Sequence, residues 1–174
     1  MKNVFNINHR LEPGRYRLEE VFPDIRSYGI LYTIFAGTEE IDQVIAHTRV
    51  FIVDNSYEMF VDNEDGSITI GLAHLRTSPD NILYLDIIHE LCHVQQCRQG
   101  RNLYDRSKAY VDRDTEIEAY LVTVREARQI GLNDEAIADY LRVAWLTPQE
   151  HQRLARRLNV TVSKGRSKNE PGGG

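Results

Sequence analysis

The chain has 174 residues, of which 41% are hydrophobic and 27% are charged, and its formal net charge is -5. These proportions are typical of a soluble globular protein, and the acidic balance argues against nucleic acid or an anionic membrane as the main partner. We expect a single domain over residues 1–162 and a disordered tail, 163–174, which has nothing apolar to bury.

Targeting and membrane-spanning segments are not expected. Residues 1–13 lack the apolar core of a signal peptide, and no uninterrupted apolar run approaches membrane-spanning length. The only two cysteines, Cys92 and Cys97, point in different directions if they share a helix, so we expect reduced thiols. A soft metal ligand at Cys92 is the less favoured alternative. These features predict a cytoplasmic protein.

The first half of the chain has the pattern of a small sheet. Residues 28–35 fit either a strand or a helix, and Thr38 is expected to cap a short amphipathic helix that contains Ile41 and Val44. Three strands are predicted, at 49–54, 57–61 and 67–72. The acidic stretch 62–66 lacks the spacing of a calcium loop, so we interpret it as a hairpin turn.

Helical patterns dominate from residue 78 onward. The first predicted helix covers 79–98, with Ser78 as its cap and Gly100 at its end. A second helix is expected over 112–130. Asn133 is predicted to cap a third, and a capping box from Thr147 to Glu150 to begin a fourth. Strands followed by helices predict an α+β fold, with helices packed against one sheet.

The first long helix carries the sequence HELCH, which is an HExxH motif. Residues four apart lie on the same side of a helix, so His89 and His93 can bind one tetrahedral metal ion. Glu90 lies about 100° round the helix, where it can reach water at the metal. The motif therefore predicts a zinc site with a carboxylate beside it.

A catalytic zinc site needs a third protein ligand, and the candidates are Glu116 and Glu118. At about 100° per residue, Glu116 falls on the apolar face of the second helix and Glu118 on its polar face, beside Arg125. A buried carboxylate needs a partner to offset its desolvation, and a metal bound by two histidines is a good one. We predict that Glu116 binds the metal and that Glu118 is a surface residue, pairing with Arg125.

HELCH followed by TEIEAY resembles the gluzincin branch of the zincin metallopeptidases. The second segment is similar to the third-ligand segment of Ste24/HtpX-type and ImmA/IrrE-like peptidases, although Tyr120 stands where the Ste24/HtpX type has aspartate. The resemblance implies a zincin-like fold, in which a small twisted N-terminal sheet packs on the active-site helix. It implies Glu116 as the third ligand. It also implies an edge strand that presents an extended substrate, for which 67–72 is the candidate.

The mechanism implied is zinc-dependent hydrolysis of a peptide bond in a peptide or protein substrate. Zn²⁺ held by His89, His93 and Glu116 would polarise the scissile carbonyl and activate water. Glu90 would accept the proton of that water and deliver it to the departing amine.

Other groups are expected to support this chemistry. The chemically able oxyanion donors are His151, Tyr110, Tyr120 and Tyr140. Of these we select His151. Asp86, three residues before His89, and Asp112, four before Glu116, are candidates for orienting the ligands.

Simpler interpretations remain open for several residues. His9, His47 and His74 are assigned surface or core roles, and His151 could equally be a solvated histidine. Three arginines of the last helix, Arg153, Arg156 and Arg157, are interpreted as a solvated face. For the whole chain, the alternative to a peptidase is a zincin-like metal-binding domain that acts as an interaction or regulatory module without turnover.

Overall fold

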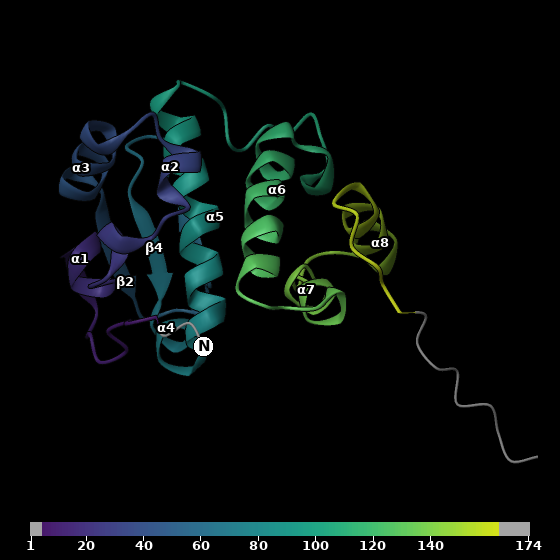
Figure 1. The fold of residues 1–174 in the computed structure, drawn as a ribbon, viewed down its shortest axis with the longest axis horizontal. Coiled ribbons are helices and arrows are strands. Elements are labelled where there is room, and N and C mark those ends of the chain that lie inside the picture. The colour runs from purple at the N-terminus through teal and green to yellow at the C-terminus, as the bar shows by residue number, and fades with distance from the viewer. Residues whose placement is uncertain (1–4, 164–174) are drawn as a thin grey trace, which may run out of the picture.

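The computed structural model describes residues 5–163 and has the predicted α+β architecture. A four-stranded mixed sheet in the N-terminal half is followed by a mostly helical C-terminal half (Figure 1). Apart from Ser163, the predicted disordered tail lies outside the described residues. Among the described helices, none is both long enough and apolar enough to span a membrane.

The sheet has the strand order β1-β2-β4-β3. Its strands are β1 (Gly14–Arg17), β2 (Arg49–Val53), β3 (Met59–Val61) and β4 (Ile68–Gly71). β1 runs antiparallel to β2, β2 parallel to β4, and β4 antiparallel to β3. The three strands expected from sequence are present, whereas β1 was not predicted, because GRYR lacks an alternating apolar pattern.

The strand order corrects the choice of edge strand. β4, which lies within the predicted strand 67–72, is flanked by β2 and β3 and is therefore an inner strand. β3 is the edge strand, and it packs against the helix that carries HELCH. Any strand added to this side of the sheet would pair with β3.

The turn between β3 and β4 is the predicted hairpin. The Asp62 amide donates to the Ser67 carbonyl at 2.8 Å, and Gly66 adopts a φ of 72°, which favours glycine. At the other end of β4, a Cβ on Gly71 would lie 1.7 Å from the Tyr57 carbonyl oxygen. Only glycine allows the chain entering β3 to approach β4 this closely.

Short helices precede and cover the sheet. They are α1 (Leu18–Val21), the 3-10 turn η1 (Ile25–Ser27), α2 (Leu31–Ile34) and α3 (Thr38–His47). The ambiguous stretch 28–35 contains the short helix α2. Thr38 is not a cap, because Gly37, with a φ of 140°, occupies the N-cap position and Thr38 begins the helix. In Figure 1 the sheet lies between α1 and α3 on one side and α5 on the other.

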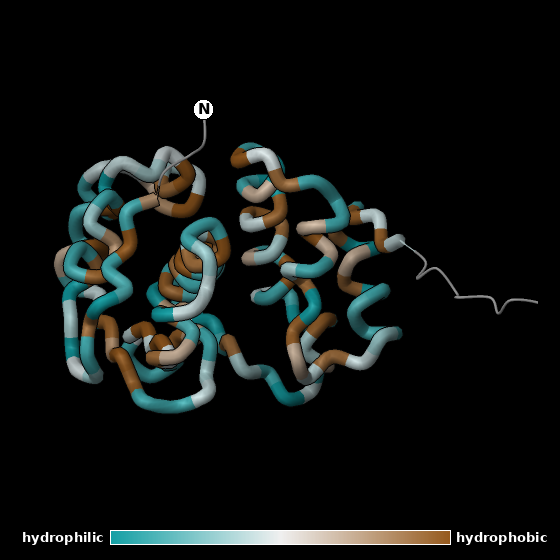
Figure 2. The backbone as a smooth tube through the Cα atoms, turned by 90° about the horizontal axis from the view of Figure 1, so that it is seen from below, coloured by the Kyte–Doolittle hydropathy of each residue, from teal (hydrophilic) through white to brown (hydrophobic). Residues whose placement is uncertain are grey.

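Helix α5 (Asp80–Arg98) follows α4 (Leu72–Thr77) and forms the centre of the molecule. Pro79 takes its N-cap position, and the predicted cap, Ser78, instead bonds the Nδ1 of His74 at 2.9 Å. Within α5 every residue of the stretch 83–94 except Asp86 is buried, because the helix is covered by the sheet and by α6. Figure 2 shows α5 between the two halves, with many brown segments.

The C-terminal half begins with the 3-10 turn η2 (Tyr110–Asp112) and continues with α6 (Asp114–Gln129), α7 (Asp134–Tyr140) and α8 (Pro148–Arg157). The predicted caps of the last two helices are confirmed. Asn133 accepts from the Ala136 amide, and Thr147 and Glu150 form a capping box. α6 packs along α5, and this pairing brings the two predicted site segments together.

Candidate metal centre

Helix α5 presents the HExxH residues on a buried surface. His89, Glu90 and His93 are 5%, 7% and 5% exposed. One helical turn separates the two imidazoles, whose Nε2 atoms are 3.0 Å apart. Nitrogen atoms this close can share a proton or a cation, but two protonated rings would repel each other.

Helix α6 contributes Glu116 to the same point. Its Oε2 lies 3.2 Å from the Nε2 of His89 and 3.3 Å from the Nε2 of His93. Ligand atoms placed 2.0–2.1 Å from a tetrahedral zinc ion are about 3.3 Å apart, so the three atoms have nearly the spacing that such an ion requires. His89, His93 and Glu116, hereafter the triad, form a buried group that could hold a metal ion.

The two candidate glutamates of α6 point in different directions, as expected from the helical period. Glu116 is 5% exposed and faces the histidines, whereas the Glu118 side chain is half exposed. The predicted pair between Glu118 and Arg125 is not formed. Glu118 instead forms an ion pair with Arg101, one of whose contacts is 3.0 Å long, and it accepts a bond from Gln96.

The protonation of the triad reflects its burial and its mutual contacts. Burial alone would lower the pKa of His93, but its bond to Glu116 and the charges of Glu90 and Glu116 raise it to about 9. Burial and the neighbouring His93 lower the pKa of His89. Although burial opposes ionisation of Glu116, the hydrogen bonds from both histidines lower the pKa of this carboxyl. A cation is therefore favoured at this point, and metal binding would displace the proton.

Glu90 is a buried carboxyl group next to the triad in the sequence and lines the same cavity as the triad. Burial raises its pKa to about 8, although the charge of His93 opposes this shift. Within the described residues its Oε2 atom is buried and has no hydrogen-bond partner. A buried carboxylate oxygen without a partner is costly, and water held at the triad would satisfy it.

The residues that orient the triad differ from the predicted ones. The Nδ1 of His93 contacts the Oε1 of Gln96 at 2.7 Å, and Gln96 in turn donates to the Thr115 carbonyl on α6 at 2.9 Å. Gln96 therefore ties α5 to the start of α6 and fixes the His93 ring, a role typical of second-sphere groups. Sequence spacing alone does not single out a glutamine three residues after a histidine.

The two predicted orienting acids have other partners. Asp86 accepts bonds from His74 at 2.7 Å and from Tyr140 at 3.0 Å. Asp112 pairs with Arg153 at 2.7 Å and with Arg157 at 3.0 Å. Two of the three arginines expected to form a solvated face of α8 therefore anchor this helix to η2.

His151 does not join the triad. Its ring is buried, and its Nε2 contacts the Ala138 carbonyl oxygen at 2.7 Å, so it links α8 to α7. Of the other proposed oxyanion donors, Tyr120 packs against the His89 ring, with centroids 4.3 Å apart. The Tyr120 and Tyr110 hydroxyls are 2.8 Å apart, and either can donate. One hydroxyl hydrogen of this pair remains available.

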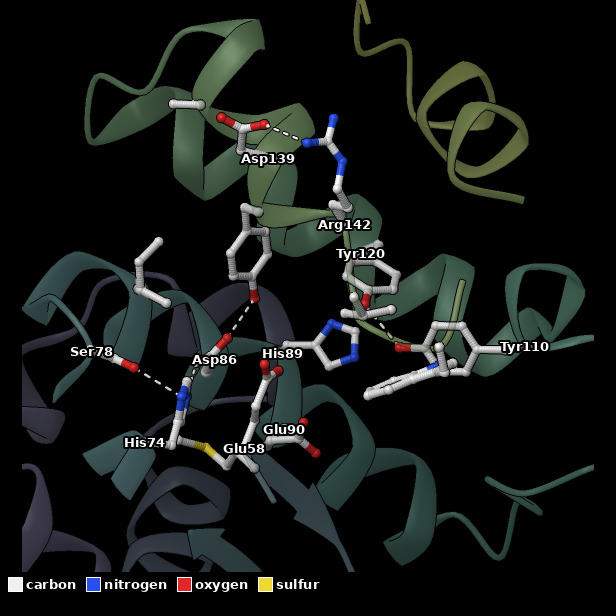
Figure 3. A pocket seen from close by; sticks show the side chains of 16 residues that line it. Glu58, His74, Ser78, Asp86, His89, Glu90, Tyr110, Tyr120, Asp139 and Arg142 are labelled. Atoms are coloured by element: carbon white, nitrogen blue, oxygen red, sulfur yellow. Dashed lines mark hydrogen bonds and ion pairs between the residues drawn. The ribbon is translucent and has the colours of Figure 1, made fainter. Parts of the chain in front are cut away.

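An open cleft gives access to the triad. Two adjoining cavities, of about 500 and 720 Å³, share Glu58, Met59, His89, Glu90, Tyr110 and Trp145 in their walls. Because His89 and Glu90 belong to both, the cavities are two halves of one cleft centred on HELCH. Figure 3 shows His89 and Glu90 between a charged cluster, which contains His74 and Asp86, and the pair of Tyr110 and Tyr120.

The charged cluster was not anticipated from the sequence. His74 bonds Asp86 through Nε2 and Ser78 through Nδ1, and all three residues line the smaller half of the cleft (Figure 3). Burial alone would lower the pKa of His74, but the bond to Asp86 and the charges of Asp86 and Glu58 raise it. The cluster joins α4 to α5, and through Tyr140 to α7.

The raised pKa of His74 predicts a pH-dependent contribution to stability. The folded state favours the protonated ring, so this contribution is complete below the unfolded pKa of about 6.5 and is lost as the pH rises through the folded value. His74→Gln is expected to lower the free energy of unfolding by about 1 kcal/mol more at about pH 5.5 than at about pH 9. Urea unfolding at both pH values measures this difference. His47→Gln, at an exposed histidine on α3, is the control, and an equal loss at both pH values for His74→Gln would contradict the expectation.

Comparisons with protein-family models, with curated proteins and with solved structures found no match. The resemblance to the gluzincins therefore rests on the HELCH and TEIEAY segments and on the convergence of their buried side chains.

Proposed function

We propose that the protein is a zinc-dependent metallopeptidase of the gluzincin type. The observation that carries this proposal is the convergence of the triad beside the buried carboxylate of Glu90, on the floor of an open cleft. A structural metal site needs no adjacent base and no opening, whereas a hydrolytic site needs both.

Zinc is the ion that best suits these donors. Two imidazole nitrogens and one carboxylate oxygen form the ligand set of several catalytic zinc sites, and three protein ligands leave a tetrahedral position open. Magnesium and calcium prefer sites made of oxygen atoms only. A bound zinc ion would polarise a peptide carbonyl and lower the pKa of water.

Glu90 carries the proton transfers in this proposal. It accepts the proton of the attacking water and donates it to the amine nitrogen when the C–N bond breaks. Burial raises its pKa to about 8, which favours the protonated form that donates to the amine, and a bound zinc ion would favour the ionised form that accepts the proton of water. The Tyr110–Tyr120 pair replaces His151 as our candidate for stabilising the oxyanion, because it lines the cleft beside His89.

The edge strand β3 offers one residue for pairing with an extended substrate. Glu58 and Asp62 bond to β4 through their backbones, so by alternation Met59 and Val61 turn their N–H and C=O groups outward. The Val61 carbonyl already accepts from the Tyr104 hydroxyl at 2.5 Å. Met59 is therefore the residue at which we place the substrate backbone.

Metal removal tests the proposed function. Protein purified without chelators is expected to carry about one zinc ion per chain and to cut a denatured protein mixture, with mass spectrometry reporting new termini. Dialysis against a chelator is expected to abolish cleavage and lower the melting temperature, and added zinc to restore both. A protein that holds zinc but cuts no substrate would instead support a metal-binding regulatory module. One that holds no metal would contradict both.

A further inference from the structure

Exposed aromatic side chains gather in one half of the cleft. Five large hydrophobic side chains are exposed among residues 5–163, and three of them, Tyr57, Tyr104 and Trp145, line the larger cavity. They are 60%, 44% and 60% exposed. Aromatic surface concentrated at one opening is typical of a binding site, whereas exposed apolar residues scattered singly need no explanation.

These side chains come from three segments and are held in place by further contacts. The Tyr104 hydroxyl is bonded to β3, Tyr57 lies edge-on to Phe60 with centroids 5.4 Å apart, and Trp145 lies edge-on to Tyr110 at 5.6 Å. Held rings lose little conformational freedom when a ligand binds, so their surface is preorganised. We call the cavity that they line, of about 720 Å³, the aromatic half of the cleft.

The other half of the cleft has a different character. Its walls carry the cluster of His74 and Asp86 and an exposed ion pair between Asp139 and Arg142, 3.4 Å long. Glu58 lines both halves and, within the described residues, its carboxylate has no ion-pair or hydrogen-bond partner. The cleft is therefore richer in aromatic surface on one side of Glu90, where Glu58 and Arg113 also line the wall, and more charged on the other.

We propose that the aromatic half binds a large apolar or aromatic side chain of the peptide substrate, next to the bond that is cut. This inference rests on the proposed peptidase function and adds its specificity. A phenylalanine or leucine side chain would bury its surface against the three rings, while the backbone pairs with Met59.

Trp145 is the only tryptophan of the chain and lines both halves of the cleft, so its fluorescence reports on binding anywhere in the cleft. The Tyr57→Ala substitution then tests whether the aromatic half is the one occupied. The experiment uses zinc-loaded Glu90→Gln protein, in which binding can be measured without turnover. The probes are two blocked peptides of alanine and serine residues that differ only at the centre, where one has phenylalanine and the other serine. We expect the emission spectrum of Trp145 to change when the phenylalanine peptide is added. The Kd of this peptide is expected to be roughly tenfold lower than that of the serine peptide.

Two further substitutions show where the preference arises. Tyr57→Ala in the same background is expected to remove most of the tenfold preference while leaving the Trp145 reporter intact. Tyr32→Ala is the matched control, because Tyr32 is 62% exposed on α2 and lines neither half of the cleft. Equal Kd values for the two peptides, or no spectral change with either, would overturn the inference.

Cleavage of the same two peptides by the parent protein, which retains Glu90, separates this inference from the proposed function. Cleavage of both peptides at equal rates would overturn the specificity and leave the peptidase proposal standing. Selective binding of the phenylalanine peptide without cleavage would support the aromatic half as a binding site and count against the peptidase.

Discussion

Glu116→Ala is expected to lower zinc affinity by roughly a hundredfold or more, because loss of an outer-sphere partner alone typically costs 10–100-fold. The substitution removes one of three ligand atoms from a site where the two histidines cannot complete the coordination themselves. It also leaves His89 and His93 without the carboxylate that bonds both rings. Metal content after dialysis, together with competition against a chromogenic chelator, measures the effect.

Glu118→Ala is the matched control, two residues away on the same helix. This substitution removes an exposed ion pair with Arg101 and a bond from Gln96, but no atom that faces the histidines. Metal content is expected to stay near that of the parent. If Glu118→Ala strips the metal and Glu116→Ala does not, the triad is not the metal site.

The triad could be predicted because its residues follow from helical periodicity. His89, Glu90 and His93 depend only on spacing within one helix, and the choice of Glu116 over Glu118 depends only on which face of a second helix is apolar. Neither inference requires knowing how the two helices pack. Once both helices form and bury their apolar faces, the three side chains face the same interface.

The residues around the triad could not be predicted in the same way. Whether Asp86 bonds His89 or His74 depends on where α4 lies, and α4 was not expected from sequence. The edge strand depends on strand order, which local alternation does not encode. The predicted cap at Thr38 was wrong, because the backbone conformation of Gly37 places the N-cap one residue earlier. The predicted cap at Asn133 is confirmed, because its side chain accepts a bond from the backbone amide three residues further on.

Glu90→Gln is expected to retain zinc but to lower kcat about 10²–10⁴-fold, the usual contribution of a positioned acid–base group. Glutamine keeps the size and place of the side chain but cannot take a proton from water. Because Glu90 does not contribute one of the three convergent ligand atoms, the metal content of the variant is expected to stay near that of the parent. Peptide hydrolysis by the zinc-loaded variant, compared with the parent at equal metal content, measures the loss.

The Glu90→Gln result separates the two functions that the triad allows. A metal-binding module has no use for a base, so under that alternative a neutral amide in place of a buried carboxylate would cost nothing. It could even stabilise the fold, since burial opposes ionisation of Glu90. A carboxylate retained at a stability cost beside a metal site is expected only where proton transfer is needed. Increased stability with unchanged metal and lost hydrolysis would therefore identify Glu90 as the base, whereas undiminished hydrolysis would show that another group takes the proton.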